Sequence, residues 1–431
     1  MIDRTIAPEI QKIDKIDYQT PEEFKLPNGI KIFCLKSDNS PVVKIDVVFK
    51  AGITFQTEKL QAIFANSLLK EAPEGKIPNE IAAFFDYYGS FIENYVGTET
   101  AGIKLYVPSY FVEEVLPVFA DLFINPSMPE KEFGILKNKQ EQLLLSNLEK
   151  TKYLAMRTLN NELFGNNNPA GQIINPEDIS AVSLDSIRNF VSDYYRANNC
   201  YIILSGMITD DLLKLCDKYF GVHHVNSSWN NNSGIKKINY PINESSEKFR
   251  WIEVKNSVQS SLYLGKNLGT LSNEELIDVG ILNTVFGGYF GSRLMKNIRE
   301  DKGYTYGIGS FILEYPQTST LKITSDVGTD VAKATIKEIF KEMEILRNEL
   351  ISELELELVK NYMLGEIISS FDGVINSSEI WEKLISNGKS NDYIDMQIDR
   401  IKNITSIELK DIANKYLIEE GFHTVVAGRE Y

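Results

Sequence analysis

Short apolar runs alternate with amphipathic stretches over about the first half of the chain. The apolar runs indicate strands, because they are rich in β-branched and aromatic residues and are bounded by Gly, Pro or Asn. Strands are predicted at 30–35, 42–49, 90–96, 101–107 and 200–206, the first four as two antiparallel pairs. Apolar residues at helical spacing predict helices at 57–71, from Pro78 onward, and at 111–124, 130–164 and 184–195.

The same order of elements returns in the second half. Between the halves, residues 223–243 are rich in Asn, Ser and Gly and have no apolar period, which predicts an interdomain linker. Strands are then expected at 261–265, 304–313, 319–326 and 424–428, and helices at 273–286, 331–346, 352–370 and 404–416. Each half ends with a helix, a tyrosine, an apolar strand and a glycine, so the pattern predicts an internal duplication.

This pattern predicts an α+β fold made of two homologous domains, because strands come before and among the helices of each half. We expect each domain to hold a mostly antiparallel sheet with helices packed on one face. The N-terminal domain is predicted at 1–222, the linker at 223–247 and the C-terminal domain at 248–431. With 431 residues, of which 43% are hydrophobic, the chain is large enough for two such cores.

Charge and composition narrow the function classes. The formal net charge of -15 argues against nucleic-acid binding as the main activity and favours neutral or basic peptide partners. Three cysteines without metal-ligand spacing fit a reducing compartment. No apolar run is long enough to span a membrane, and residues 1–25 lack the pattern of a signal peptide. We therefore expect a cytoplasmic protein without a membrane span, or a periplasmic one if the chain is a processed mature form.

The stretch 287–307 combines a glycine-rich turn, a helical run and the start of a strand. The turn contains three glycines, Gly287, Gly288 and Gly291, which either let the backbone approach a substrate closely or merely shape the turn. Arg299 and Tyr306 lie seven positions apart across the following corner, so both side chains can reach one crevice. A helix C-terminal arginine and a packed tyrosine also explain this spacing, since basic residues favour helix C-termini.

The duplicated halves, the linker and this corner resemble the pitrilysin/insulinase/mitochondrial-processing-peptidase family over about residues 22–428. The corner reads Ser292-Arg293-Leu294, then Arg299-Glu300, Gly303 and Tyr306, and it is similar to the family pattern S-R-L…R-E-x-x-G-x-x-Y. The resemblance implies that Arg299 and Tyr306 are functional residues rather than packing residues.

The chain departs from the family at the metal site. Family members are zinc peptidases with an H-x-x-E-H motif, in which two histidines bind zinc and the glutamate activates water. The matching positions here hold Ile63, Asn66 and Ser67. Isoleucine has no lone pair to give a metal, and an amide cannot take a proton from water. The only histidines are His223 and His224 in the linker and His423 before the last strand, so we expect no metal or other cofactor in this chain.

The resemblance implies a role without a zinc site of its own. Some bacterial family members work as two-chain peptidases, in which a zinc-bearing H-x-x-E-H subunit pairs with a homologous subunit that lacks the motif and supplies an arginine and a tyrosine. Here those residues are Arg299 and Tyr306, which would bind the substrate peptide and stabilise its oxyanion. The alternative is a structural or peptide-binding member with no role in catalysis. An unrelated enzyme chemistry has little support, since no phosphate loop or nucleophile elbow is found.

Overall fold

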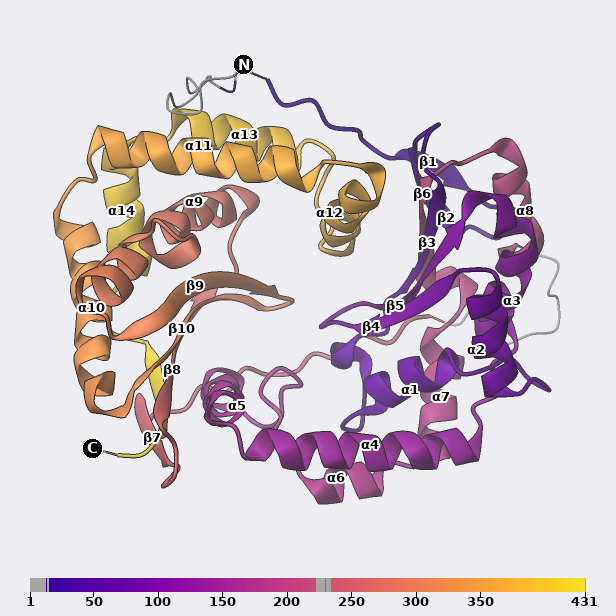
Figure 1. Ribbon diagram of the computed structural model, residues 1–431, viewed down its shortest axis with the longest axis horizontal. Helices are drawn as coiled ribbons and strands as arrows, with labels where there is room; N and C mark the ends of the chain where they lie inside the picture. Colours follow the sequence, from indigo (N-terminus) through magenta and orange to yellow (C-terminus); the bar gives the residue numbers. More distant parts are fainter. Residues whose placement is uncertain (1–12, 14, 222–228, 230–233, 431) are drawn as a thin grey trace, which may run out of the picture.

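The protein, described by a computed structural model at residues 13, 15–221, 229 and 234–430, contains two α+β halves (Figure 1). Within the described residues the strands of the first half are β1 (Glu22–Lys25), β2 (Lys31–Lys36), β3 (Val42–Phe49), β4 (Phe91–Val96), β5 (Ala101–Pro108) and β6 (Cys200–Gly206). Those of the second half are β7 (Phe249–Glu253), β8 (Gln259–Gly269), β9 (Thr305–Tyr315), β10 (Thr318–Gly328) and β11 (His423–Gly428).

The two sheets repeat one topology. The first has the order β1-β2-β6-β3-β5-β4 and the second β7-β11-β8-β10-β9. The first sheet has one additional strand, β1. Without it, the strands of both sheets have the same spatial order when each half is numbered along its own sequence: first, last, second, fourth and third. In the described chain only β2-β6 and β7-β11 are parallel pairs, so both sheets are mostly antiparallel. The predicted fold class and duplication are confirmed. The predicted pairing of strand 30–35 with strand 42–49 is wrong, because β6 lies between β2 and β3.

The helices follow the predicted order, with several additions. In the first half they are α1 (Gln61–Leu69), α2 (Pro78–Tyr87), α3 (Val112–Ile124), α4 (Glu130–Leu148), α5 (Thr151–Phe164), α6 (Pro176–Ala181), α7 (Leu184–Tyr194) and α8 (Asp210–Phe220). In the second half they are α9 (Asn273–Asn283), α10 (Ala332–Asn348), α11 (Glu353–Ser370), α12 (Val374–Ser386), α13 (Tyr393–Asn403) and α14 (Ser406–Tyr416). The sequence prediction missed β1, β7, α6, α8, α12 and α13. Part of the predicted linker 223–247, at 223–228 and 230–233, lies outside the described residues.

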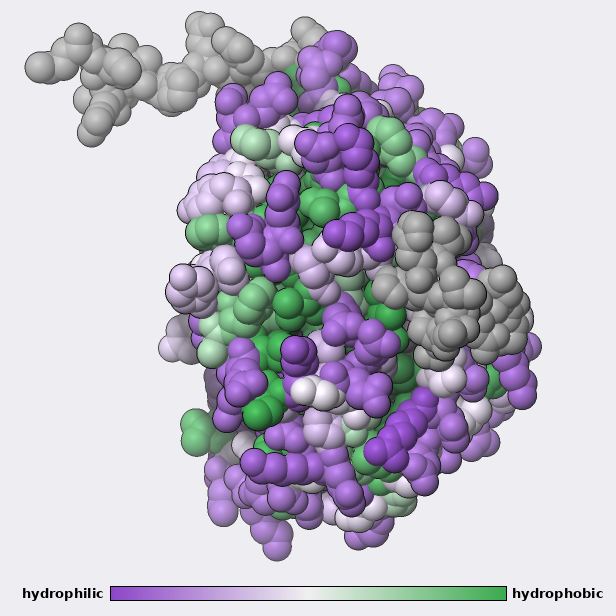
Figure 2. Space-filling model, turned by 90° about the vertical axis from the view of Figure 1, so that its right-hand side faces the viewer, coloured by the Kyte–Doolittle hydropathy of each residue, from purple (hydrophilic) through white to green (hydrophobic). Residues whose placement is uncertain are grey.

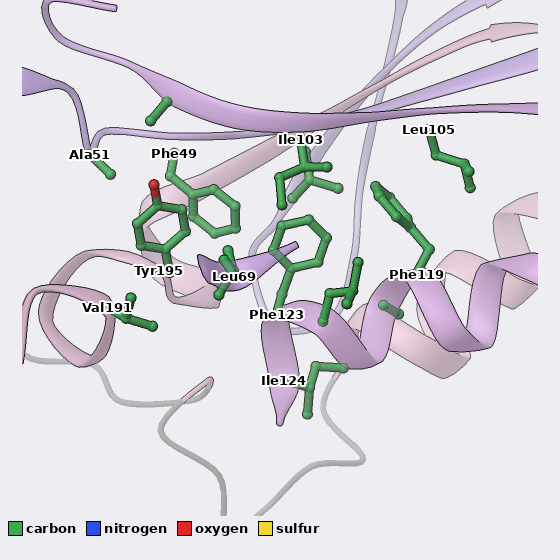
Figure 3. Close-up of a cluster of buried hydrophobic side chains, with 14 of the residues drawn as sticks. Phe49, Ala51, Leu69, Ile103, Leu105, Phe119, Phe123, Ile124, Val191 and Tyr195 are labelled. Atoms are coloured by element: carbon green, nitrogen blue, oxygen red, sulfur yellow. The ribbon is translucent and has the colours of Figure 1, made fainter. Parts of the chain in front are cut away.

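The core of the first half lies between its sheet and the helices on one face (Figure 3). Phe49 at the end of β3 contacts Phe123 of α3, with ring centroids 5.5 Å apart, and Tyr195, with centroids 4.8 Å apart. All three side chains are buried. Burying one such aromatic or aliphatic side chain contributes about 1.5–3 kcal/mol, so this layer fixes the helices on the sheet.

Each sheet is also contacted by a helix from the other half, which the expectation of helices on one face did not include. The predicted helix 130–164 is interrupted between Leu148 and Thr151, and this break turns α5 onto the second sheet, where it contacts β8 and β11. Conversely, α12 of the second half contacts β2 and β6 of the first sheet. The halves are therefore joined by an exchange of helices.

The segment before β1 also connects the halves. Figure 1 shows it running from the side of α11 and α13 across to β1. Tyr18 stacks on Phe371 with ring centroids 4.9 Å apart, and the indole N–H of Trp381 on α12 donates to the Gln19 carbonyl at 2.9 Å. This segment, predicted as part of the N-terminal domain, thus packs on the C-terminal half.

The surface mixes charged and apolar side chains. Figure 2 shows apolar groups interrupted by hydrophilic ones on the side of the first half. Among the described helices, none has the length and hydrophobicity that crossing a bilayer requires.

Candidate functional site

The glycine-rich corner is built on two π-helices, where the sequence predicts ordinary α-helix. The helix α9 ends at Asn283 and continues as a π-helix at Thr284–Gly288, and a second π-helix spans Met295–Asp301. At its end the Lys302 N–H bonds the Asn297 carbonyl, five residues back, at 3.1 Å. Such wide turns are rare and occur frequently at functional sites.

Arg299 lies in the second π-helix and is held by an aromatic ring. Its guanidinium carbon lies 4.4 Å from the ring centroid of Phe290, which is itself exposed in the glycine-rich turn. In the described part of the chain, this cation–π contact is the only specific interaction found for Arg299, whose guanidinium hydrogen-bond donors are therefore available to a ligand. Sequence reasoning missed Phe290, because its contact depends on the path of the turn.

Tyr306 is presented by a β-bulge at the start of β9. The β9–β10 register places Ile308 opposite Ser325 and Thr305 opposite Val327, so Tyr306 and Gly307 together face one residue of β10. The Thr305 hydroxyl stabilises this bulge. It accepts a hydrogen bond from the Gly307 N–H at 3.0 Å and donates one to the Asp326 carbonyl at 2.7 Å. As a result Tyr306 is 92% exposed. Bulges commonly re-aim a side chain beside active sites.

Arg299 and Tyr306 line one open pocket of about 690 Å³, as their spacing predicts. The other residues around it are Gln259, Glu300, Gly303, Tyr304, Thr305, Gly328, Asp330 and Val331. All of them belong to the C-terminal half. Among the described residues, the pocket is therefore formed at one end of the second sheet and is not shared between the two halves of this chain.

The three predicted glycines serve packing in this structure. A Cβ at Gly287 would lie 2.5 Å from the Ser310 hydroxyl oxygen of β9, and one at Gly288 would lie 3.0 Å from the Asn283 side-chain nitrogen. A Cβ at Gly291 would meet the Tyr289 ring at 2.7 Å. None of the three is among the described residues that line the Arg299–Tyr306 pocket. Their contact with a substrate stays a prediction.

Of the three positions on α1 that match the zinc motif, only Asn66 lies in the core. Asn66 is fully buried: its side-chain amide donates to the Gly102 carbonyl at 3.1 Å and accepts from Asn94 at 2.8 Å. Ile63 packs against the surrounding apolar side chains, and Ser67 is half-buried. This donor set does not fit zinc, since it offers neither imidazole nor carboxylate.

No other place in the described residues replaces this site. They contain no cluster of three His, Cys, Asp or Glu side chains placed to hold a metal. His423 is buried at the start of β11, where one ring nitrogen lies 2.8 Å from the Lys248 ammonium and the other 3.1 Å from the Glu247 carbonyl. His223 and His224 lie outside the described residues.

Comparison with known proteins supports the family resemblance. The family model described as "Peptidase M16 inactive domain" matches residues 181–363, a range that includes the corner. Over these residues the chain is similar to the M16 peptidases. This confirms the resemblance drawn from the sequence.

Several relatives match most of the chain. An "Uncharacterized zinc protease YmxG" of Bacillus subtilis is 25% identical over 375 residues, which cover 86% of this chain and 87% of the relative. A "Non-peptidase homolog YmxG" of Helicobacter pylori is 25% identical over 281 residues, covering 62% of this chain and 61% of the relative.

Solved structures confirm the fold. A crystal structure of an M16 inactive domain from Pseudomonas fluorescens has a TM-score of 0.84 at 22% identity, covering 95% of this chain and 98% of that one. A protease from Helicobacter pylori has a TM-score of 0.84 at 16% identity, covering 95% and 100%.

Proposed function

We propose that this chain is the non-catalytic subunit of a two-chain zinc peptidase of the M16 type. Its partner would be a homologous subunit with an intact H-x-x-E-H motif, and the partner alone would hold zinc. The observation that carries this proposal is the pairing of Arg299 and Tyr306 at one open pocket in a chain whose own α1 has no metal ligands.

The chemistry of the pair fits peptide hydrolysis. A guanidinium and a phenol both donate hydrogen bonds, and both can donate to a scissile carbonyl and to the oxyanion that develops on it. Phe290 restrains Arg299 and the bulge presents Tyr306, so both donors are set before the substrate arrives. Removing one such donor typically costs about 3–4 kcal/mol in the transition state.

The substrate class follows from charge and shape. The pocket is open, and its rim carries the Glu300 and Asp330 carboxylates, for which no ion pair is found in the described residues. Together with the net charge of -15, this favours a neutral or basic peptide. We place this activity in the cytoplasm, or in the periplasm if the chain is a processed form.

Substitution of the two donors in the assembled complex tests the proposal. Mixed with its cognate zinc subunit, the wild-type chain is expected to support peptide cleavage. Arg299→Ala and Tyr306→Phe should still assemble, as size-exclusion chromatography would show, but should lower kcat/KM by about 10²- to 10³-fold. Arg188→Ala and Tyr87→Phe are matched controls, because both side chains are exposed on the other half.

Unchanged turnover with either donor removed from an intact complex would show that the pair is structural. The chain would then be a scaffold or peptide-binding member of the family, without a role in catalysis. Failure of every zinc-bearing homologue to bind the chain would count against the two-chain arrangement itself.

A further inference from the structure

A partly buried charge cluster joins the two halves at α12. Lys44 on β3 and Lys104 on β5 each donate to a different carboxylate oxygen of Glu379 on α12, both at 2.5 Å. Lys44 also donates to the Ser378 hydroxyl at 2.9 Å. The Lys44 side chain is 1% exposed and that of Lys104 is 12% exposed, whereas the Glu379 side chain is 39% exposed, so the lysines are buried and the carboxylate that joins them reaches the surface. In Figure 1, α12 stands beside the first sheet although it belongs to the second half.

Asp46 lies in the same cluster with half of its carboxylate unpaired. It is fully buried on β3, between its partners in the sheet, and Tyr95 donates to one of its oxygens at 3.2 Å. Its other oxygen has no hydrogen-bond partner among the described residues. The titratable groups that face it are Lys44 on its own strand, Lys104 and Tyr106 on β5, Tyr95 on β4, Tyr201 on β6, and Glu379 and Glu382 on α12.

We infer that the contact of α12 with the first sheet is a proton-sensitive latch between the halves, which is firmest when Asp46 is protonated. The charges support this: the two lysines balance Glu379 and Glu382, and an ionised Asp46 adds a third negative charge that nothing in the cluster neutralises. An uncompensated charge in a buried ion-pair network is strongly unfavourable.

The direction with pH follows from the same contacts. Burial raises the pKa of Asp46 from 3.8 to about 7, so the folded chain holds this proton more tightly than the unfolded chain does. The stabilisation is complete below the unfolded value and is lost as pH rises toward about 7. The ammonium groups of Lys104 and Lys44 instead lower the pKa of Glu379 against its burial, so its contribution is lost only in acid. Between about pH 5 and 8 the change in stability therefore comes mainly from Asp46. Glu382 contributes in the same direction, because burial raises its pKa as well.

Hydrogen–deuterium exchange on the isolated full-length chain tests the latch, and it needs no partner subunit or activity. The reporter is the α12 segment 374–386, with rates corrected for the intrinsic effect of pH. In Glu379→Gln we expect α12 to exchange about tenfold faster or more at pH 6, while α3 and α10 keep their rates. Lys104→Met removes only one of the two ion pairs and is expected to have a smaller effect in the same segment.

The variant Asp46→Asn tests whether the α12 contact depends on the proton of Asp46. In the wild type, α12 should exchange faster at pH 8 than at pH 6, whereas in Asp46→Asn, which mimics the protonated carboxyl, this difference should shrink to the part that Glu382 contributes. Asp211→Asn removes an ion pair exposed on α8 and should match the wild type throughout.

Three results would overturn the inference. The first is an unchanged exchange rate of α12 in both Glu379→Gln and Lys104→Met. The second is an equal rise of the exchange rate in all segments, which would mean global unfolding. The third is a pH difference in α12 exchange that persists at full size in Asp46→Asn.

Discussion

Arg299 depends on Phe290 for its orientation, because no other specific contact in the described chain restrains its guanidinium. A cation–π contact at an exposed site contributes about 0.5–1 kcal/mol, and up to about 2 when it is shielded from water. We therefore expect Phe290→Leu to lower kcat of the assembled complex by about 2- to 30-fold with KM little changed.

The aromatic ring itself must carry this effect. Phe290→Tyr keeps a ring and should retain the wild-type kcat, and assembly should be equal in both variants. A loss of the same size in Phe290→Tyr and Phe290→Leu would show that the turn, rather than the cation–π contact, matters.

Asn66 shows what replaced the zinc site. Its amide satisfies the Gly102 carbonyl and Asn94 in the core, so truncation leaves both without this partner. We expect Asn66→Ala to destabilise the first half by about 1–3 kcal/mol, seen as a lower urea midpoint of unfolding. The control is Asn138→Ala, also on a helix but exposed, which should be neutral or slightly stabilising. Equal midpoints for the wild type and Asn66→Ala would contradict a structural role.

At the scale of elements, the packing of the first π-helix on β9 requires Gly287. A Cβ there would come within 2.9 Å of Leu294 and closer still to Ser310, both of which are buried. We expect Gly287→Ala to cost about 1–3 kcal/mol of stability, measured by thermal unfolding. Gly365→Ala is the opposite case, because this glycine lies inside α11 with no atom within 4 Å of the added methyl, and it should stabilise by about 0.5–1 kcal/mol. If Gly287→Ala and Gly365→Ala both raised or both lowered the stability, the close approach of Gly287 to β9 would not be the reason for its effect.

For the whole molecule, the loss of the zinc motif predicts an inactive isolated chain. We expect purified protein to contain no stoichiometric zinc by elemental analysis and to cleave no peptide alone, because Ile63, Asn66 and Ser67 offer no suitable ligands. Activity is expected only after the zinc-bearing homologue is added. One tightly bound zinc per chain, with peptidase activity that chelation removes, would contradict this prediction.

The order of elements was predictable because periodicity is a local property. Apolar positions repeat every second residue in the strands and every third or fourth in the helices, and the two halves repeat this order. The absence of histidines at the motif positions is also written in the chain, and it removes the zinc site whatever the fold. The stretch with Arg299 and Tyr306 could likewise be singled out from residue order alone, through the family pattern.

Tertiary structure decided how these parts are used. No local pattern says that α5 packs on the second sheet and α12 on the first, because that choice depends on contacts between residues far apart in the chain. The same holds for the bulge that exposes Tyr306, which arises from the register of β9 on β10, and for Phe290 beneath Arg299. In the sequence, the apolar strands contain three isolated polar residues, Lys44, Asp46 and Lys104. Only the tertiary structure shows that Glu379 of α12 binds the two lysines. Spacing along the chain specifies which elements form, whereas the pocket and the charge cluster exist only where separate elements meet.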